Sequence, residues 1–215
     1  VAAVMVAMVQ HNLKKLLSYH AISQVGYMVL GIGTLNPLGI AGGLFHMLNH
    51  SIYKSCLFLC SGAVEKKTGT AELGELGGLA KAMPITFGAF LVAALSISGI
   101  PPFNGFVSKW MVYQGALEAT GNTPHAWKIL PLVILISAMF GSALTLASFM
   151  KALYSVFLGQ KTELTKKVEH DVPFEMKLPL VVLSLLCIGF GVFYALPLEK
   201  FIYPAIGIEA KAIGI

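Results

Sequence analysis

The sequence has no arginine and few charged residues of any kind. Only 12% of its 215 residues are charged, which is about half of the roughly 25% found in a soluble domain. Apolar residues make up 56% of the chain, and the mean hydropathy is +0.78. Apolar runs of about twenty residues, the length that crosses a bilayer as a helix, recur along the chain. We therefore predict an all-α, polytopic membrane protein in which residues 1–215 form a single membrane domain and no soluble domain is present.

Cysteine is also scarce, and signals for soluble partners are missing. Cys56, Cys60 and Cys187 lie inside apolar runs and form no C-x-x-C pair, so we interpret them as small buried residues rather than metal ligands or a disulfide. The net charge is +5 and the pI is about 9.1. The lysines nevertheless lie mostly between apolar runs, without an aromatic-basic cluster, which argues against nucleic acid as a partner. No residue set for a cofactor or metal ion is visible, so none is expected.

The first ten residues read VAAVMVAMVQ. They are apolar but too few to cross a bilayer, and they lack the basic start of a signal peptide. We interpret them as the tail of a helix, and we expect the chain to be a fragment or one part of a split protein.

Apolar periodicity predicts five membrane spans joined by polar connections. The spans cover about residues 16–35, 38–64, 84–119, 129–157 and 178–196. Asn36 and Pro37 mark a tight turn, and a loop is expected at 120–126. The third span consists of two short apolar halves around a break, so we predict one discontinuous helix there. We interpret the ending after residue 196 as interfacial or frayed.

The lysines are distributed unevenly between the two sides of these spans. Alternating the spans places ten on one side: Lys14, Lys15, Lys66, Lys67, Lys81, Lys151, Lys161, Lys166, Lys167 and Lys177. The other side has Lys128, Lys200 and Lys211. The positive-inside rule predicts that the first side is cytoplasmic. Lys54 and Lys109 fit neither group because they lie inside spans.

His46, His50 and Lys54 follow one another at intervals of four residues. On a helix they lie along one face, each about 6 Å further along the axis. Ionisable groups in a membrane helix must face a protein interior or a hydrated cavity. Imidazole can pass a proton between its two nitrogens, so we favour a proton relay over hydrogen bonding between helices as structural support. A zinc site is not expected because HMLNH lacks the glutamate of H-E-x-x-H.

Lys109 lies just after the helix break in SGIPPFNGFVSKWM. The residues that break the helix are Gly99, Pro101, Pro102 and Gly105, while Asn104 and Ser108 can bond the freed backbone groups. Such breaks mark ion pathways near the middle of a membrane. In a low-dielectric site the protonation of a lysine depends on neighbouring charges. The alternative is a lysine that reaches the membrane surface, but about ten residues separate Lys109 from the next loop.

Three weaker signals accompany these residues. Lys14 begins a span, which topology alone explains, and Gln24 lies about eight residues into its span, where it could hold a water or bridge helices. Gly39 and Gly43 form a small-xxx-small pair, which predicts close helix packing.

Four segments together resemble a known family. They are NLKKLLSYHAISQVGYMVLGIG, LFHMLNHSIYKSCLFLCSGAV, LGGLAKAMP and SGIPPFNGFVSKW. They are similar to the C-terminal part of the antiporter-like subunits shared by respiratory complex I, Mrp-type sodium/proton antiporters and membrane-bound hydrogenases. The resemblance covers most of residues 10–118, and after residue 120 it is one of pattern alone.

The resemblance implies a fold of two inverted five-helix repeats with flanking helices, of which this chain holds the last five helices and a stub of the one before. It implies that Lys109 is the charged residue of the second broken helix, which is a lysine in some members and a glutamate in others. It also implies that His50 belongs to the central relay. His46, Lys54 and Lys14 match further residues of that pathway. The chain departs from the family at two positions. Asn12 stands where the family often has aspartate. Gln24 stands where some members have histidine, so a water molecule would carry the proton at that step of the relay.

The function implied is translocation of protons, with sodium as a further possibility, by a subunit with no redox centre of its own. NGFVSKW resembles hydrogenase-type members more than complex I ones, so we expect a redox-driven complex. An Mrp-type antiporter subunit and a structural anchor that lost pumping are the alternatives. The expected partners are other membrane subunits, the missing first half of the fold, and lipid. The expected location is the cytoplasmic membrane of a prokaryote.

Overall fold

A computed structural model describes residues 1–122 and 129–207, so Lys128, Lys211 and part of the expected loop at 120–126 lie outside the described residues. Within these two ranges the chain is helical and forms no β-strand, as predicted. The main helices are α1 (Ala2–Met8), α2 (Leu13–Gly33), α3 (Pro37–Thr68), α4 (Pro84–Ser98), α5 (Asn104–Asn122), α6 (Ile129–Leu153) and α7 (Phe174–Val192). Short helices α8 (Ala195–Pro197) and α9 (Tyr203–Ile206) follow. Wider π-turns cover Tyr154–Leu158 and Leu198–Ile202, and a 3₁₀ turn covers Thr165–Lys167.

Local chemistry explains where the first long helices begin and end. Asn12 caps α2, because its side chain accepts hydrogen bonds from the backbone N–H groups of Lys14 and Lys15. Asn36 caps α3 in the same way, and Pro37 stands at the first helical position, where a missing N–H is harmless. Gly69 ends α3 in the left-handed conformation, at a φ of 78°. The predicted turn between the first two spans is therefore confirmed.

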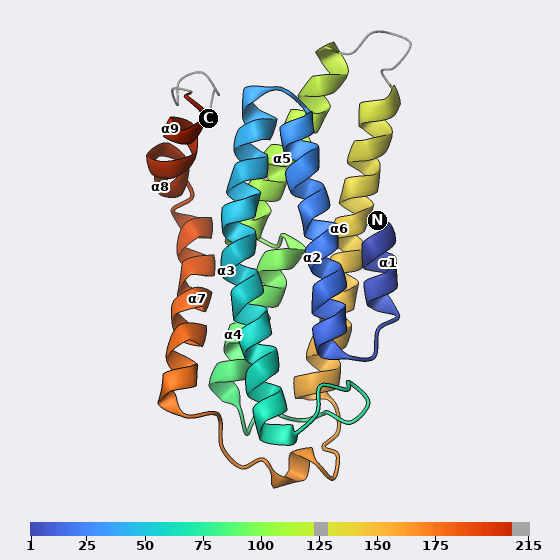
Figure 1. Cartoon of the computed structure of the whole chain (residues 1–215), viewed down its shortest axis with the longest axis vertical. Coiled ribbons are helices and arrows are strands. Elements are labelled where there is room, and N and C mark those ends of the chain that lie inside the picture. Colours follow the sequence, from blue (N-terminus) through green and yellow to red (C-terminus); the bar gives the residue numbers. More distant parts are fainter. Residues whose placement is uncertain (123–128, 208–215) are drawn as a thin grey trace.

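The helix α3 is the centre of the bundle. It packs against α2, α4, α5 and α7. Figure 1 shows α4 and α5 following one another along the bundle, with the chain leaving helical form between them. The break at residues 99–103 divides the predicted span 84–119 into these two helices, so one discontinuous element is present as predicted. By length and hydropathy alone, Ile129–Leu158 and Phe174–Val192 could cross a membrane. The helices α2 and α3 are less apolar because they contain buried polar residues such as Gln24 and His46.

Glycine allows α2 and α3 to approach closely. A Cβ atom at Gly43 would lie 2.9 Å from the backbone oxygen of Met28 and 3.1 Å from the nitrogen of Ile32. A Cβ atom at Gly39 would lie 2.9 Å from the oxygen of Gly31. Such distances leave no room for a side chain, so the predicted small-xxx-small contact is confirmed.

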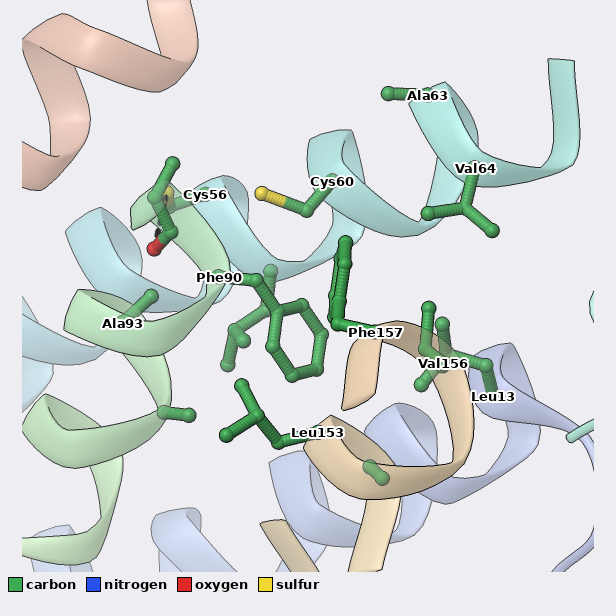
Figure 2. Close-up of a cluster of buried hydrophobic side chains, with 14 of the residues drawn as sticks. Leu13, Cys56, Cys60, Ala63, Val64, Phe90, Ala93, Leu153, Val156 and Phe157 are labelled. Carbon is green, nitrogen blue, oxygen red and sulfur yellow. Dashed lines mark hydrogen bonds between the residues drawn. The ribbon is translucent and has the colours of Figure 1, made fainter. Parts of the chain in front are cut away.

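The apolar core fills the space between α2, α3, α4, α6 and α7. Figure 2 shows Phe90 of α4 pointing toward Phe157, which follows α6. The ring centroids of this pair are 5.4 Å apart, and Phe90 lies 6.4 Å from Phe149. Cys56 and Cys60 pack into the same cluster, and all three cysteines are free and buried, as predicted.

The two ends of the bundle differ in the segments that they carry. The start of α2, the end of α3, both long connections and the start of α7 meet at one end, at the bottom of Figure 1. These segments and the end of α6 contain the ten lysines that the sequence assigns to one side, so we call this the lysine-rich end of the bundle. Lys200 lies on the Leu198–Ile202 turn near the opposite end.

The segment after α7 bears on the prediction of an interfacial or frayed ending. The last predicted span, 178–196, is α7, which begins at Phe174 and ends at Val192. The described part of the ending, up to residue 207, is mostly helical rather than frayed. Leu198 and Ile202 are buried in a cluster with Ala41 and Phe45 of α3. Their four-residue spacing gives the short helices an apolar face, which packs against α3.

Candidate ion-translocation site

The centre of the site is the break between α4 and α5. In a continuous helix, residues 101 and 102 would donate N–H groups to the carbonyl oxygens of Ile97 and Ser98. Pro101 and Pro102 have no N–H, so both carbonyls need other donors. Lys109 Nζ donates to the oxygen of Ile97 at 2.8 Å. The hydroxyl of Ser142, on α6, donates to the oxygen of Ser98 at 3.3 Å. Side chains therefore replace the backbone donors that proline removes.

Lys109 is buried, with 2% of its surface exposed. Its ammonium group also donates to Ser142 Oγ at 2.8 Å and lies 4.8 Å from the ring centroid of Tyr27. A buried ammonium needs such hydrogen-bond acceptors or aromatic faces to offset its lost hydration. A hollow of about 300 Å³ adjoins it, with largely apolar walls from α5 and α6 and with Tyr113 among the polar lining residues.

Asparagine and serine side chains hold the two half-helices in place. Asn104 accepts a hydrogen bond from Ser96 Oγ and donates to Asn49 Oδ1 at 3.1 Å. Asn49 Nδ2 in turn donates to the backbone oxygen of Asn104 at 3.0 Å. A side chain at Gly105 would collide with the carbonyl of Ser96, so glycine is required where α5 passes the end of α4. Side-chain hydrogen bonds therefore fix the positions of the two half-helices at the break.

His46 connects the break to α2. It is fully buried. Its Nδ1 lies 2.9 Å from Ser108 Oγ, and its Nε2 lies 3.1 Å from Gln24 Oε1. The row Gln24–His46–Ser108 therefore joins α2, α3 and α5 by side-chain contacts, and Ser108 directly precedes Lys109 in the chain. The hydroxyl of Tyr53 lies 3.4 Å from the same Nε2.

Lys54 and His50 lie further along α3. Lys54 is 6% exposed, and its Nζ donates to the backbone oxygen of Leu17 on α2. The ring of His50 contacts Tyr53 edge-on, with centroids 5.5 Å apart. His50 Nε2 is buried and has no hydrogen-bond partner within residues 1–122 and 129–207. His46, His50 and Lys54 therefore lie on successive turns of α3, and each has different neighbours.

Lys14 lies apart from this buried row. It forms an ion pair with Glu65 at the lysine-rich end of the bundle, and the two side chains are 45% and 38% exposed. Half-exposed pairs of this kind contribute about 0–1 kcal/mol to stability. The structure does not join Lys14 to His46 or Lys109 by hydrogen bonds between described residues.

His20 is a polar residue that the sequence patterns above did not single out. It is fully buried, its Nε2 lies 2.8 Å from Ser148 Oγ, and its ring packs on Phe149 at 4.7 Å. The sequence signal was the four-residue spacing between His20 and Gln24, which places them on one face of a helix. In the part of the chain that the structure describes, no three histidine, cysteine, aspartate or glutamate side chains are grouped to hold a metal ion.

Residues 1–133 match the family described as NADH:quinone oxidoreductase/Mrp antiporter, transmembrane. The chain belongs to this family. Its members are antiporter-like membrane subunits, so the predicted family and the predicted helical membrane fold are both confirmed. Proteins similar to this chain are subunits of multi-subunit membrane complexes.

Three similar proteins show the range of this family. An uncharacterized protein of Methanocaldococcus jannaschii is 44% identical over 195 residues, covering 90% of this chain and 38% of that protein. Formate hydrogenlyase subunit 3 of Escherichia coli is 33% identical over 199 residues, covering 86% of this chain and 32% of that protein. A chain in the solved structure of the Mrp complex from Dietzia sp. has a TM-score of 0.81 and 29% identity, covering 92% of this chain and 43% of that one. The chain thus spans less than half the length of these relatives.

Proposed function

We propose that this chain is the second half of an ion-translocating subunit in a redox-driven membrane complex, such as a membrane-bound hydrogenase or a relative of complex I. The proposal rests on one observation above all. Lys109 is buried at a helix break, bonded to a carbonyl that the break frees, and adjacent in sequence to the serine that contacts His46. A positive group in such a place responds strongly to nearby charge because the surroundings screen it poorly.

In this proposal protons move from the lysine-rich end of the bundle toward the break. They pass along α3 by way of Lys54, His50 and His46. They then reach Lys109, through Ser108 and with Gln24 holding the far side of the His46 ring. A change in charge elsewhere in the complex drives release to the other side. Lys14 and Glu65 stand at the entrance. The chain itself has no catalytic or redox role, so the driving reaction belongs to other subunits.

The main alternative in ion transport is a subunit without redox coupling. Similarity to a chain of the Mrp complex favours a sodium/proton antiporter subunit without redox coupling. Similarity to formate hydrogenlyase subunit 3 favours redox coupling. Purifying the intact complex and identifying its subunits separates them, because iron-sulfur proteins are expected only in the redox-driven case.

We also propose that the first repeat of the fold is supplied by polypeptide outside this sequence, in a neighbouring chain or in the same one. The lengths of the relatives support this, since the chain covers 38% and 32% of two of them. We place the complex in the cytoplasmic membrane of a prokaryote, with the lysine-rich end inside and lipid around the apolar faces. The intact mass of the purified polypeptide, together with its partners, tests the proposal. A polypeptide of 22.9 kDa purified without any related partner would contradict it.

The decisive experiment measures ion flux in vesicles that contain the reconstituted complex. Lys109→Ala removes the buried ammonium and is expected to abolish most proton or sodium flux while the complex still assembles. Lys167→Ala is the matched control, because Lys167 is an exposed lysine at the lysine-rich end. Flux near the wild-type level in Lys109→Ala would contradict translocation through this half and would favour the structural anchor.

A further inference from the structure

A row of hydroxyl side chains on α6 lies along the buried polar residues. Ser142, Thr145 and Ser148 recur every three residues, which places them on one side of the helix about 4.5 Å apart along its axis. Thr145 is fully buried and Ser148 is 1% exposed. Thr145 Oγ1 donates to the carbonyl of Gly141 at 2.8 Å, and its oxygen retains the capacity to accept a hydrogen bond. The row is therefore a polar stripe on a helix that is otherwise strongly apolar.

The two ends of this stripe contact two ionisable groups. Ser142 Oγ accepts a hydrogen bond from Lys109 Nζ at 2.8 Å. Six residues further along α6, Ser148 Oγ lies 2.8 Å from His20 Nε2. The helices α2 and α6 are in contact, and Figure 1 shows them running beside one another. The stripe thus extends from the charge at the helix break to a buried histidine on α2.

His20 occupies the level of the bundle between Lys54 and Gln24. Lys54 Nζ donates to the carbonyl of Leu17, three residues before His20 on α2. Gln24 follows His20 by four residues, or about 6 Å along the helix axis. On α3 the same interval, from Lys54 to His46, contains His50. One histidine on each helix therefore stands between the buried lysine and the Gln24–His46 pair.

Two polar atoms on α2 point to water in this interval. His20 Nδ1 and Gln24 Nε2 are buried, and neither has a hydrogen-bond partner among the described residues. Buried polar groups are nearly always bonded, and an ordered water is the usual partner when no side chain reaches. A proton taken up at one nitrogen of an imidazole can leave from the other. His20 therefore has the geometry to pass a proton on rather than only to pack against Phe149.

We propose that His20, with Ser148 and Thr145, forms a second branch of the proton pathway that runs parallel to His50. This branch joins Lys54 to Lys109 along the side of the bundle where α2 meets α6. It rests on the proposed translocation function and adds residues to it. Two parallel branches predict a specific effect of variants on proton flux, because removing one branch leaves the other able to carry protons.

The test is a pair of single variants and their combination, in the intact complex reconstituted in vesicles with a pH-sensitive dye. His20→Phe keeps a ring beside Phe149 but removes both nitrogens. We expect His20→Phe or His50→Ala alone to lower proton flux by about twofold, and the double variant to lower it by about tenfold or more, which exceeds the product of the single effects. Ser148→Ala combined with His50→Ala is expected to behave like the double variant.

Ser184→Ala is the matched control, because that hydroxyl donates to the carbonyl of Val181 within α7 and is expected to leave flux unchanged. A double variant with the same flux as His50→Ala would overturn the second branch. Loss of nearly all flux in each single variant would also overturn it, since that result indicates one unbranched relay. Lys109→Ala in the same preparation tests translocation itself. If Lys109→Ala abolishes flux while His20→Phe has no effect in the wild type or in His50→Ala, the second branch is wrong and the proposed function stands.

Discussion

Lys109 Nζ and the carbonyl oxygen of Ile97 are joined by a 2.8 Å hydrogen bond across the gap between α4 and α5. In an uninterrupted helix that oxygen would accept from the N–H of residue 101, which is proline here. The bond therefore links the charge of the site to the feature that breaks the helix. A movement at the break changes the surroundings of the ammonium group, and a change in its charge alters how the two half-helices are held.

This relationship predicts the behaviour of Lys109→Glu. An ionised glutamate only accepts hydrogen bonds, so it cannot replace the bond to Ile97 unless it is protonated. We expect flux between that of the wild type and that of Lys109→Ala, because the family resemblance includes glutamate at this position. Vesicle flux measurements on the three proteins decide the order. Equal flux in Lys109→Glu and Lys109→Ala would show that a titratable group at this place is insufficient.

His50→Ala is predicted to lower flux while the complex still assembles. The ring of His50 contacts Tyr53, and its Nε2 has no hydrogen-bond partner among the described residues. No side-chain hydrogen bond of His50 therefore supports the packing of α3 in the part of the chain that the structure describes. Assembly is checked by copurification of the partner subunits. Failure of the variant to assemble would favour a structural role for His50, and unchanged flux would contradict its place in the relay.

Gly43→Ala is predicted to weaken the contact between α2 and α3. The added Cβ atom would lie 2.9 Å from the Met28 oxygen, which is backbone and cannot move alone. Overpacking of this kind costs about 1–3 kcal/mol, seen as a lower thermal midpoint of the purified complex. Gly62→Ala on the same helix is the control, since nothing lies within 4 Å of its Cβ position. It is expected to leave the midpoint unchanged or raise it, so a larger loss there would contradict the packing argument.

The Lys14–Glu65 pair allows stability and flux to be separated. Both side chains are partly exposed, so Lys14→Gln and Glu65→Gln are each expected to lower stability by at most about 1 kcal/mol. If Lys14 feeds the pathway, Lys14→Gln lowers flux, whereas Glu65→Gln keeps the lysine and most of the flux. Thermal midpoints and vesicle flux of the two variants provide the comparison. Equal flux in both would remove Lys14 from the pathway.

The helices and the break could be predicted from the sequence because their causes are local. Long apolar runs predict α2 to α7, and Asn36 with Pro37 predicts the start of α3. Pro101 and Pro102 predict the break, since a residue without an N–H cannot continue the helical hydrogen bonds wherever it is placed. A lysine in the middle of an apolar span also indicates a buried charge by its position in the chain alone. The sequence did not decide between an interfacial and a frayed ending, because its apolar face is short and interrupted by Pro197 and Pro204.

The connections within the site were decided by tertiary structure. His20 and Ser148 are 128 residues apart in the chain, and His46 and Ser108 are 62 apart. A helical pattern shows which residues share a face, but not which face of another helix they meet. That depends on the rotation and depth at which the helices pack, which glycines such as Gly43 set through close backbone contact. The sequence therefore determined that charges lie inside the membrane, and the packing of α2, α3, α5 and α6 decided which groups they touch.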